Sequence, residues 1–344
     1  MLTKKQIEEF RDYLKKAENP LFFFDDDPDG LCSYLILKKY IDKGKGVILK
    51  TKPTLTLDLY RKIEEYCPDY VFILDIPIVD QELLNKINVP VIWLDHHQPL
   101  ERSRVHYYNP MLNKPKDNKP TTYYANEIAE NKFLWLATIG TISDWYYPKF
   151  AKEFSKLYPL ILPKNIKKAN QAIFDSKLGD LIMIFTLILK GPTYKIHRMA
   201  SLLTKIDDPM ELIENITPRA KFINREVSQQ KKEYEHIIKQ LELQKPTKDK
   251  LFIVYLPTSK NSYTSQLSNL MIYKYPKKII MVIRQKDDAM IMSVRSSKQK
   301  IEKIFRESLE GLDGFGGGHD LACGGSIAKE QFEIFLSRFK EKLK

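Results

Sequence analysis

Cysteine is scarce in the chain and shows none of the spacings that bind zinc or build a disulfide framework. Three cysteines, Cys32, Cys67 and Cys323, occur among 344 residues. Their number is odd and no C-x-x-C pair is present, so the sequence argues against a structural zinc site and against a disulfide-rich scaffold. We expect all three to be reduced and buried.

Long apolar runs are also missing. The longest, at residues 181–189 (LIMIFTLIL), has about half of the roughly 20 residues that a membrane-spanning helix needs. The first residues, MLTKKQIEEF, are charged and lack the apolar core of a secretory signal. We therefore expect a soluble, cytoplasmic protein that has no contact with a membrane.

Acidic residues are outnumbered by basic ones. The chain has 56 Lys and Arg against 44 Asp and Glu, a formal net charge of +12. A positive surface favours a polyanionic partner such as nucleic acid, because binding releases counterions. Surfaces rich in Lys and Glu are equally typical of thermophilic proteins, so the charge leaves both interpretations open.

Four short apolar runs alternate with helix-like segments in the first third of the chain. They are LFFF, VILK, VFIL and VIWL, beginning at Leu21, Val47, Val71 and Val91. Continuous apolar runs separated by amphipathic stretches are typical of buried parallel strands with helical crossovers. The pattern predicts an α/β domain with a doubly wound, mostly parallel sheet.

The remainder of the chain divides into three parts. A polar loop at residues 109–120 leads into helical material that extends to about Lys205. The polar segment 210–243, which Pro218 interrupts, resembles a connecting helix. From Leu251 the strand and helix pattern returns as LFIVYL, IIMVIR, MIMSVR, a glycine loop and CGGSI. We expect a domain at 1–205, a helical linker at 206–248 and a smaller α/β domain at 249–344.

The densest acidic cluster follows the first apolar run. Residues two apart in an extended segment point to the same side, so Asp25, Asp27 and Asp29 converge. Two like charges about 4 Å apart repel by roughly 4 kcal/mol at an effective dielectric near 20, so the cluster requires cations or protons. A divalent metal would satisfy it, although a solvated turn or a helix N-cap is the simpler alternative.

Two further strands end in metal-competent side chains. Asp75 follows VFIL, and Asp95-His96-His97 follows VIWL. Ligands of α/β proteins lie at the carboxyl ends of the strands, so these groups are expected to meet. Carboxylates with imidazole and no thiolate suit Mn²⁺ better than structural zinc. Asp144, at the end of an apolar helix, is either a further ligand or a solvated helix-end charge.

These motifs, in this order, resemble the DHH phosphoesterases, especially their RecJ-like branch. The chain has D-x-D-x-D-G, a lone Asp75, Asp-His-His and G-T-x-x-D, and far downstream the GGGH signature of the DHH-associated C-terminal domain. Many relatives place a histidine four residues before the Asp27 position, where this chain has Phe23, so Asp25 would serve as in the RecJ-like branch. The Lys-rich composition together with this first motif suits an archaeal source.

The resemblance implies two divalent ions, Mn²⁺ first and Mg²⁺ or Co²⁺ as alternatives. One ion would be held by Asp29, Asp75, His96 and Asp144, and the other by Asp25, Asp27 and Asp75. His97 would contact the scissile phosphate, and Asp95 would orient the histidines. The substrate would be bound by the glycine loop and the segment after MIMSV, which comprise Arg295, Ser296, Gly316, Gly317, Gly318 and His319. For Arg295, an exposed charge is the simpler alternative.

The predicted function is a two-metal phosphodiesterase that acts on single-stranded DNA, RNA or short oligonucleotides as an exonuclease and releases mononucleotides. Two alternatives stay open: a non-catalytic RecJ-like subunit of a replication or repair assembly, and a cyclic-dinucleotide phosphodiesterase. Non-catalytic relatives typically lose ligands, whereas every ligand position is filled here. An active nuclease would also be compatible with replication or repair partners. Strand polarity and oligomeric state are not indicated by the sequence.

Overall fold

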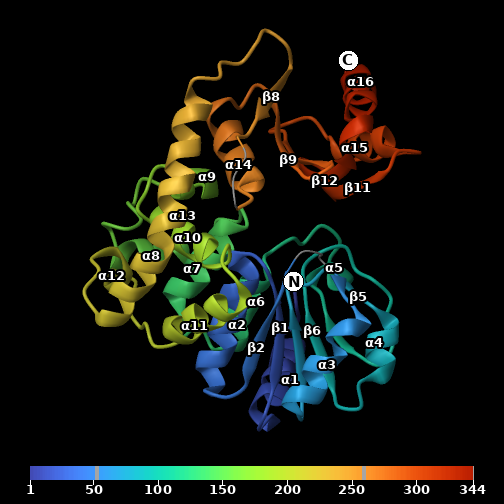
Figure 1. The fold of residues 1–344 in the computed structure, drawn as a ribbon. Coiled ribbons are helices and arrows are strands. Elements are labelled where there is room, and N and C mark those ends of the chain that lie inside the picture. Colours follow the sequence, from blue (N-terminus) through green and yellow to red (C-terminus); the bar gives the residue numbers. More distant parts are fainter. Residues whose placement is uncertain (51–53, 258–260, 344) are drawn as a thin grey trace. The chain divides into compact units, whose positions relative to one another are not determined.

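The computed structural model describes residues 1–50, 54–257 and 261–343 (Figure 1). The chain forms two compact units, Met1–Val227 and Ser228–Lys344. The long helix α13 (Pro218–Glu242) contributes its first residues to the N-terminal unit and the others to the C-terminal unit.

A five-stranded parallel sheet organises the N-terminal unit (Figure 1). Its strands lie in the order β2-β1-β4-β6-β7. Their bounds are β2 Lys45–Leu49, β1 Leu21–Asp25, β4 Val71–Leu74, β6 Val91–Leu94 and β7 His106–Tyr108. The chain runs from β1 outward to β2 and then returns to the other side of β1 for β4. This reversal places the topological switch point, where doubly wound proteins bind their ligands, between β1 and β4.

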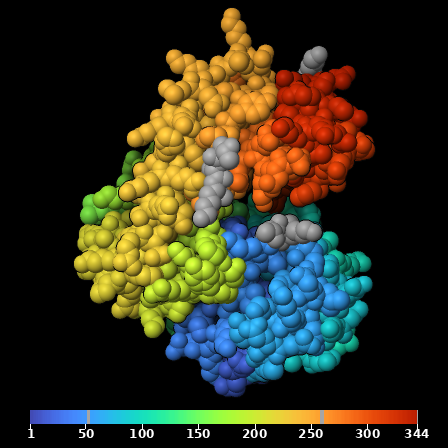
Figure 2. All heavy atoms as spheres, in the orientation of Figure 1, coloured from blue at the N-terminus to red at the C-terminus, as the bar shows by residue number. Residues whose placement is uncertain are grey.

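Helices cover both faces of this sheet. On one face Phe23 and Ile73 pack in a core with residues of α3 (Tyr60–Tyr66) and α4 (Gln81–Lys86). The blue atoms around α3 form part of the front of this unit in Figure 2, beside yellow-green atoms of its helical region. On the other face Phe22 stacks on Phe72 with ring centroids 5.1 Å apart, beneath α1 (Lys4–Lys16) and α2 (Pro28–Ile41). The predicted doubly wound sheet is confirmed.

The structure adds short elements that the pattern did not predict. Strand β7 has three residues with a polar start, too few for an apolar run to be recognised. A two-stranded pair, β3 (Thr54–Leu55) and β5 (Ile78–Val79), lies beside a 3-10 turn at Leu57–Leu59. The expected loop at 109–120 contains the short helix α5 (Pro110–Asn113), which begins with proline at a position that tolerates a missing N–H.

The region from 121 to 203 is mostly helical, as predicted, and one further short helix, α12 (Met210–Ile213), lies in the expected linker. The elements of the region are α6 (Thr121–Ile128), α7 (Leu134–Ser143), α8 (Ala151–Leu157), α9 (Ala169–Phe174), α10 (Leu178–Ile188) and α11 (Thr193–Leu203). None of the helices in the described ranges combines the length and the apolar character that crossing a bilayer requires.

The cysteines differ in their surroundings. Cys32 and Cys323 are buried, as expected, but Cys67 is exposed. Cys67 follows the last residue of α3 in a left-handed conformation, and its thiol donates to the carbonyl of Glu64. The prediction that all three are buried was wrong because the apolar character of cysteine says nothing about a helix end.

The C-terminal unit is built on a mixed five-stranded sheet. The strand order is β11-β12-β10-β9-β8, with β8 parallel to β9 and the other pairs antiparallel. The bounds are β8 Leu251–Tyr255, β9 Ile279–Lys286, β10 Ala289–Arg295, β11 Gly314–His319 and β12 Ala322–Ala328. Helices α15 (Glu302–Leu309) and α16 (Phe332–Lys342) supply Phe305, Phe335 and Phe339 to its core. On the other face, the hydroxyl oxygen of Ser268 in α14 (Thr264–Lys274) lies 2.9 Å from the hydroxyl oxygen of Ser293 in β10.

The predicted connecting segment is divided just before Pro218: α12 ends at Ile213, and Pro218 opens α13 as its first helical residue, where proline is favoured. One local prediction in the second half was wrong. The glycine segment is not a loop, because Gly314–His319 pairs with β12 as an edge strand, with Gly317 opposite Gly324. Three consecutive glycines are typical of loops, and Gly316–Gly318 can be recognised as part of a strand only from their pairing with β12.

Candidate metal centre

Every metal-competent residue predicted in the N-terminal unit lies at the carboxyl edge of the parallel sheet. Asp25 ends β1 at the switch point, and Asp75 follows the neighbouring strand β4. His96 and His97 follow β6 one strand further along. Asp27 accepts a hydrogen bond from the N–H of Gly30 and so caps α2, which means that the helix-cap interpretation and the acidic cluster coexist.

These side chains form three overlapping groups whose ligand atoms lie within 4.8 Å of one another. The groups are Asp25 with Asp27 and Asp75, Asp29 with His96 and Asp144, and Asp75 with His96 and His97. Nε2 of His96 lies 3.4 Å from Asp75 Oδ1, 3.9 Å from Asp29 Oδ2 and 3.7 Å from Asp144 Oδ2. Seven side chains from distant segments therefore meet in one place.

Asp29 is fixed by the start of α6. The backbone N–H groups of Thr121 and Thr122 donate to its two carboxylate oxygens, each at 2.8 Å. The hydroxyl of Thr122 also donates to the Asp29 carbonyl at 2.9 Å. Free N–H groups at a helix start favour an anion, so this end of α6 orients the carboxylate.

Asp75 has an uncommon backbone conformation. Its φ is +62°, in the left-handed region that few residues other than glycine adopt, although aspartate and asparagine tolerate it better than most. The hydroxyl of Thr121 donates to Asp75 Oδ1 at 2.9 Å. Conformations of this kind are concentrated at functional sites, where the surrounding structure holds them in place.

Asp144 reaches the group from the C-terminal end of α7. The N–H of Trp145 bonds to Ile142 O and the N–H of Tyr146 bonds to Thr141 O, which is the Schellman pattern of helix termination. A carboxylate at a helix C-terminus meets the negative end of the helix dipole, so Asp144 requires a cation there. Gly140 allows the approach of α7, because a Cβ at that position would lie 2.4 Å from Thr122 Oγ1 and 2.7 Å from Cys32 Cβ.

The carboxylates repel one another. Burial, followed by the charge of Asp27, raises the pKa of Asp25 to about 8. Burial and the charges of Asp29 and Asp27 likewise raise the pKa of Asp75 and of Asp144 well above the usual range. Buried carboxylates that cannot ionise together, beside an imidazole, form a donor set that suits a divalent cation. The residues present therefore fit a divalent metal.

Asp26 faces a separate pair of cations. Burial raises its pKa to about 6, while the charges of Lys190 and Lys50 act in the opposite direction. The ammonium of Lys50 donates to the carbonyls of Leu189 and Gly191, which flank Lys190. Burial in turn lowers the pKa of Lys190. A partly desolvated lysine thus lies near the acidic cluster.

His97 is held by Asp95. Its Nδ1 lies 2.7 Å from Asp95 Oδ1, and its backbone N–H donates to Asp95 Oδ2 at 3.1 Å. Tyr107 and Asn109 also donate to Asp95, at 3.3 Å and 3.4 Å. Burial disfavours the imidazolium, but the hydrogen bond and charge of Asp95 outweigh it and raise the pKa of His97 to about 9. His97 is therefore protonated at neutral pH and able to donate from Nε2.

Several of these supporting residues carry no clear signal in the sequence. Thr121, Thr122, Asn109 and Tyr107 follow segments of ordinary loop composition, and Lys190 follows an apolar helix. For Thr121 and Thr122, the only signal in the sequence is the preference of threonine for the beginning of a helix. Their role depends on which helix end faces the strand ends, a tertiary property.

The predicted substrate residues gather at one end of the C-terminal sheet. Arg295 on β10 pairs with Ala322 on β12, which pairs with His319 on β11. The guanidinium of Arg295 donates to Asn269 Oδ1 at 2.7 Å, and burial lowers its pKa to about 10. Arg295 is therefore not the freely exposed charge of the simpler alternative. Ser296 is buried and accepts from the N–H of Gln299, which makes it part of the turn after β10.

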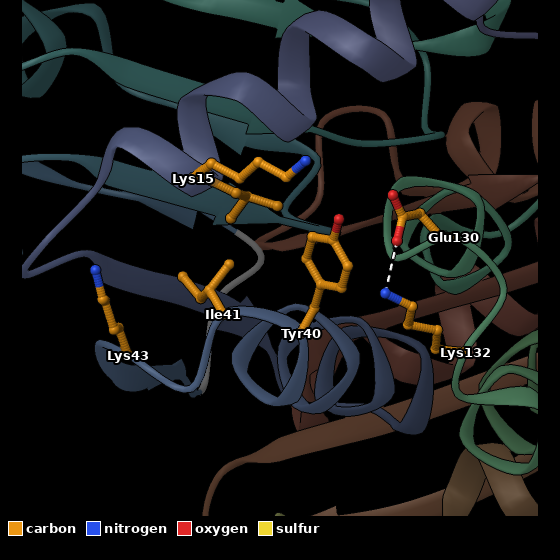
Figure 3. A pocket seen from close by; sticks show the side chains of 7 residues that line it. Lys15, Tyr40, Ile41, Lys43, Glu130 and Lys132 are labelled. Carbon is orange, nitrogen blue, oxygen red and sulfur yellow. Dashed lines mark ion pairs between the residues drawn. The ribbon is translucent and has the colours of Figure 1, made fainter.

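A hollow of about 410 Å³ lies elsewhere on the N-terminal unit, between the C-terminal ends of α1 and α2 (Figure 3). Lys15, Tyr40 and Lys132 line it. A helix that follows a parallel strand runs back to the amino edge of the sheet, so this hollow is remote from the carboxyl edge. Lys132 is paired with Glu130 at 2.6 Å. The hollow is separate from the metal-competent groups.

Comparison with known proteins fits this geometry. Residues 248–344 match the DHHA1 domain. Over 99% of its length the chain aligns with RecJ in complex with Mn²⁺ from Thermus thermophilus, at a TM-score of 0.74 and 19% identity. The chain has a RecJ-like DHH fold. It covers 55% of that RecJ chain, and so spans about half the length of this relative.

Two other solved structures align over 99% of the chain. An exonuclease RecJ bound to manganese is covered to 95% at a TM-score of 0.65 and 18% identity. The DHH domain of a member of the S1p family of ribosomal proteins is covered to 90% at a TM-score of 0.67 and 16% identity. No curated protein sequence matches the chain. The resemblance to RecJ-like DHH proteins that the motifs indicated is confirmed.

Proposed function

We propose that the chain is a metal-dependent phosphodiesterase that hydrolyses single-stranded nucleic acid or short oligonucleotides and releases mononucleotides. The position of Asp75 carries the proposal. It belongs to one metal-competent group with Asp25 and Asp27, and its Oδ1 lies 3.4 Å from His96, which belongs to a second group. A carboxylate shared by two groups is the arrangement that a pair of ions requires.

One ion would be held by Asp29, Asp75, His96 and Asp144, and the other by Asp25, Asp27 and Asp75. When bound, two such ions lower the pKa of a water and stabilise the attacking and leaving oxygens of a phosphoryl displacement. Mn²⁺ suits the mixture of carboxylate and imidazole, with Mg²⁺ or Co²⁺ as alternatives. A RecJ of similar fold was solved with Mn²⁺ and also with Mg²⁺.

The side chains around the ions have separate tasks. Asp95 holds the His97 ring through Nδ1, and Nε2 would donate to a non-bridging phosphate oxygen. The hydrogen bond and charge of Asp95 raise the pKa of His97, so this contact would be charge-assisted and would stabilise the negative charge of the reacting phosphate. Thr121 and Thr122 keep Asp29 in its orientation throughout.

The C-terminal unit would bind the rest of the substrate. Gly316, Gly317, Gly318 and His319 would contact the nucleotide, and Arg295 and Ser296 would supply polar contacts at the same end of the sheet. In this proposal residues 1–205 form the catalytic domain, 206–248 the linker and 249–344 the substrate-binding domain. The net charge of +12 supports a polyanionic substrate.

A non-catalytic role in a replication or repair assembly is the main alternative. A chain with that role alone has no need to retain buried, mutually repelling carboxylates, which are costly without a cation. Here Asp29 and Asp75 are both about 1% exposed and retain their supporting hydrogen bonds. An active site of this composition is compatible with protein partners but does not require them.

The test is a Mn²⁺ titration with four substrates side by side: single-stranded DNA, short RNA, a cyclic dinucleotide and pyrophosphate. Asp75→Ala serves as the inactive control. We expect Mn²⁺-dependent release of mononucleotides from the linear substrates by the wild type and none by Asp75→Ala. Preferential cleavage of the cyclic dinucleotide would favour that alternative substrate. Equal activity of the two proteins on every substrate would overturn the proposal.

A further inference from the structure

Trp145 occupies a position at which helix geometry favours glycine. It follows the C-cap residue Asp144 in the Schellman motif of α7, and its φ is +63°. The residue at this position adopts the left-handed conformation, which is why glycine and asparagine predominate there. A bulky aromatic residue in that region is a genuine outlier.

The other non-glycine residues with positive φ within the described ranges have polar side chains or are cysteine. Trp145 is the aromatic exception, and it lies next to a predicted metal ligand. Outliers that persist at such places point to function, because folding alone would favour a smaller residue.

The exposure of the ligands shows which side of the metal centre is open. The side chains of Asp29, Asp75 and His96 are 1%, 2% and 5% exposed. Asp144 is 34% exposed, and the His97 side chain is 27% exposed, so solvent and substrate can reach the centre from the side that these two residues line. Adjacent Cα atoms are about 3.8 Å apart, which places Trp145 at this opening.

The indole itself is available for contact. Trp145 is 40% exposed, a large fraction for tryptophan, and its ring has one aromatic neighbour in the described ranges, Phe174, at a centroid distance of 6.3 Å and a tilt of 59°. Packing in the core would bury it, as it buries Trp93 and Trp135. The ordinary alternative is a hydrophobic cap contact with Phe174, which a smaller aliphatic residue would make as well.

We infer that Trp145 is a base-stacking residue, which binds the nucleobase next to the phosphodiester at the metal centre. The inference rests on the proposed function and specifies its substrate as a strand with an unpaired, accessible base. Stacking on an aromatic ring is tolerant of base identity, because every base has a π-face. Trp145 would therefore position single-stranded substrate without selecting a sequence.

The test compares binding of oligothymidylate with binding of an abasic deoxyribose-phosphate oligomer of equal length, with Ca²⁺ in place of Mn²⁺ so that turnover does not consume the ligand. Trp145→Gly removes the indole and relieves the backbone strain, and denaturant unfolding checks that this variant is folded. Trp145→Phe retains a ring as the matched control. The Mn²⁺-induced shift in melting temperature reports whether the metal centre is intact.

We expect Trp145→Gly to bind oligothymidylate roughly 5- to 100-fold more weakly, the range that base stacking supplies, and Trp145→Phe to stay within a few-fold of the wild type. Binding of the abasic oligomer and the Mn²⁺-induced shift should be alike in all three proteins. Oligothymidylate should also quench the fluorescence of the wild type more than that of Trp145→Phe, because Trp93 and Trp135 are buried.

Equal affinity of Trp145→Gly and wild type for oligothymidylate would overturn the inference, as would an equal loss for both oligomers or no measurable binding by the wild type. The proposed function is judged separately, by Mn²⁺-dependent hydrolysis. If the wild type hydrolyses the substrate and Trp145→Gly binds oligothymidylate as tightly as the wild type, only the stacking role is refuted. If Trp145→Gly loses base-dependent binding but the wild type shows no Mn²⁺-dependent hydrolysis, the phosphodiesterase function is refuted and the stacking role stands.

Discussion

The hydroxyl of Thr121 donates a hydrogen bond of 2.9 Å to Asp75 Oδ1, and its backbone N–H donates to Asp29 Oδ2 at 2.8 Å. One residue at the start of α6 thereby fixes carboxylates that follow two neighbouring strands, β1 and β4. Partners that orient metal ligands typically change metal affinity about 10- to 100-fold when they are removed.

Thr121→Val should therefore weaken Mn²⁺ binding by roughly 10- to 100-fold, measured by isothermal titration calorimetry. Valine preserves the shape and the backbone N–H to Asp29, and removes only the hydroxyl. Thr186→Val is the control, since the hydroxyl of Thr186 bonds to Ile182 O within α10. Unchanged affinity in Thr121→Val would show that Asp75 needs no such partner.

Asp75→Asn should have opposite effects with and without metal. Asparagine tolerates the positive φ and, unlike Asp75, does not have to take up a proton on folding into the acidic cluster, so the free energy of unfolding of the metal-free protein should rise by about 1 kcal/mol or more at neutral pH. The additional stability that Mn²⁺ gives the wild type should be lost together with hydrolysis. Denaturant unfolding with and without Mn²⁺ measures both effects. Asp80→Asn, at the start of α4, is the control and should change neither the metal-free stability nor the stabilisation by Mn²⁺. If Mn²⁺ stabilises Asp75→Asn as much as the wild type, the role of Asp75 as a shared ligand is contradicted.

The metal-free protein should lose stability as the pH rises. The pKa of Asp25 is raised to about 8 from an ordinary value of 3.8, so between these values the folded state holds a proton that the unfolded chain releases. This contribution to stability is complete below about pH 4 and is lost as the pH approaches 8. Mn²⁺ displaces the proton, so its apparent affinity should increase over the same interval. Unfolding of chelator-treated protein at several pH values, with and without Mn²⁺, tests both trends; an affinity independent of pH would refute them.

Asp95→Asn should move the alkaline limb of the pH–rate profile. The pKa of His97 is about 9 in the wild type, so the protonated form is present below that value and the rate falls as the pH rises through it. Without the hydrogen bond and charge of Asp95, only the charges of Asp144 and Asp25 oppose the effect of burial, so the limb should move to lower pH. Tyr107→Phe keeps Asp95 charged and should leave the limb near 9. Superimposable profiles for wild type and Asp95→Asn would exclude His97 as the donor.

Gly317→Ala should separate substrate binding from folding. A Cβ at Gly317 meets nothing within 4 Å, so the fold should tolerate the methyl group, yet a substrate that contacts this face of β11 should bind at least several-fold more weakly. Gly317→Val should weaken substrate binding further and leave metal binding unchanged. Gly191→Ala, whose Cβ would make ordinary contacts in the N-terminal unit, is the control. Unaltered substrate affinity in both Gly317 variants would refute the role of the glycines.

Much of the candidate metal centre could be predicted because most of its metal-competent side chains follow apolar strands. A strand such as Val71–Leu74 is recognisable from composition, and parallel strands bring their carboxyl ends to one edge, so Asp75 and His96 had to be near each other. Asp144 was a weaker prediction, since its place depends on how α7 packs against α2.

The residues that escaped prediction act through tertiary contacts or unusual backbone. In the sequence, Thr121 follows a stretch of loop composition. Its role becomes visible only in the structure, where its N–H at the start of α6 donates to Asp29. Trp145 follows an apolar segment of the sequence, and nothing in that segment indicates its positive φ. The glycines of β11 suggested a loop because only β12 supplies their hydrogen-bond partners.

Gly140 contributes no ligand atom, yet a methyl group there would separate α7 from Thr122 and Cys32 and carry Asp144 away from His96. A related chain could thus retain all of its aspartates and histidines and be inactive through this one replacement. When active and inactive relatives are sorted from their sequences, the residue four places before the last aspartate should be read together with the ligands themselves.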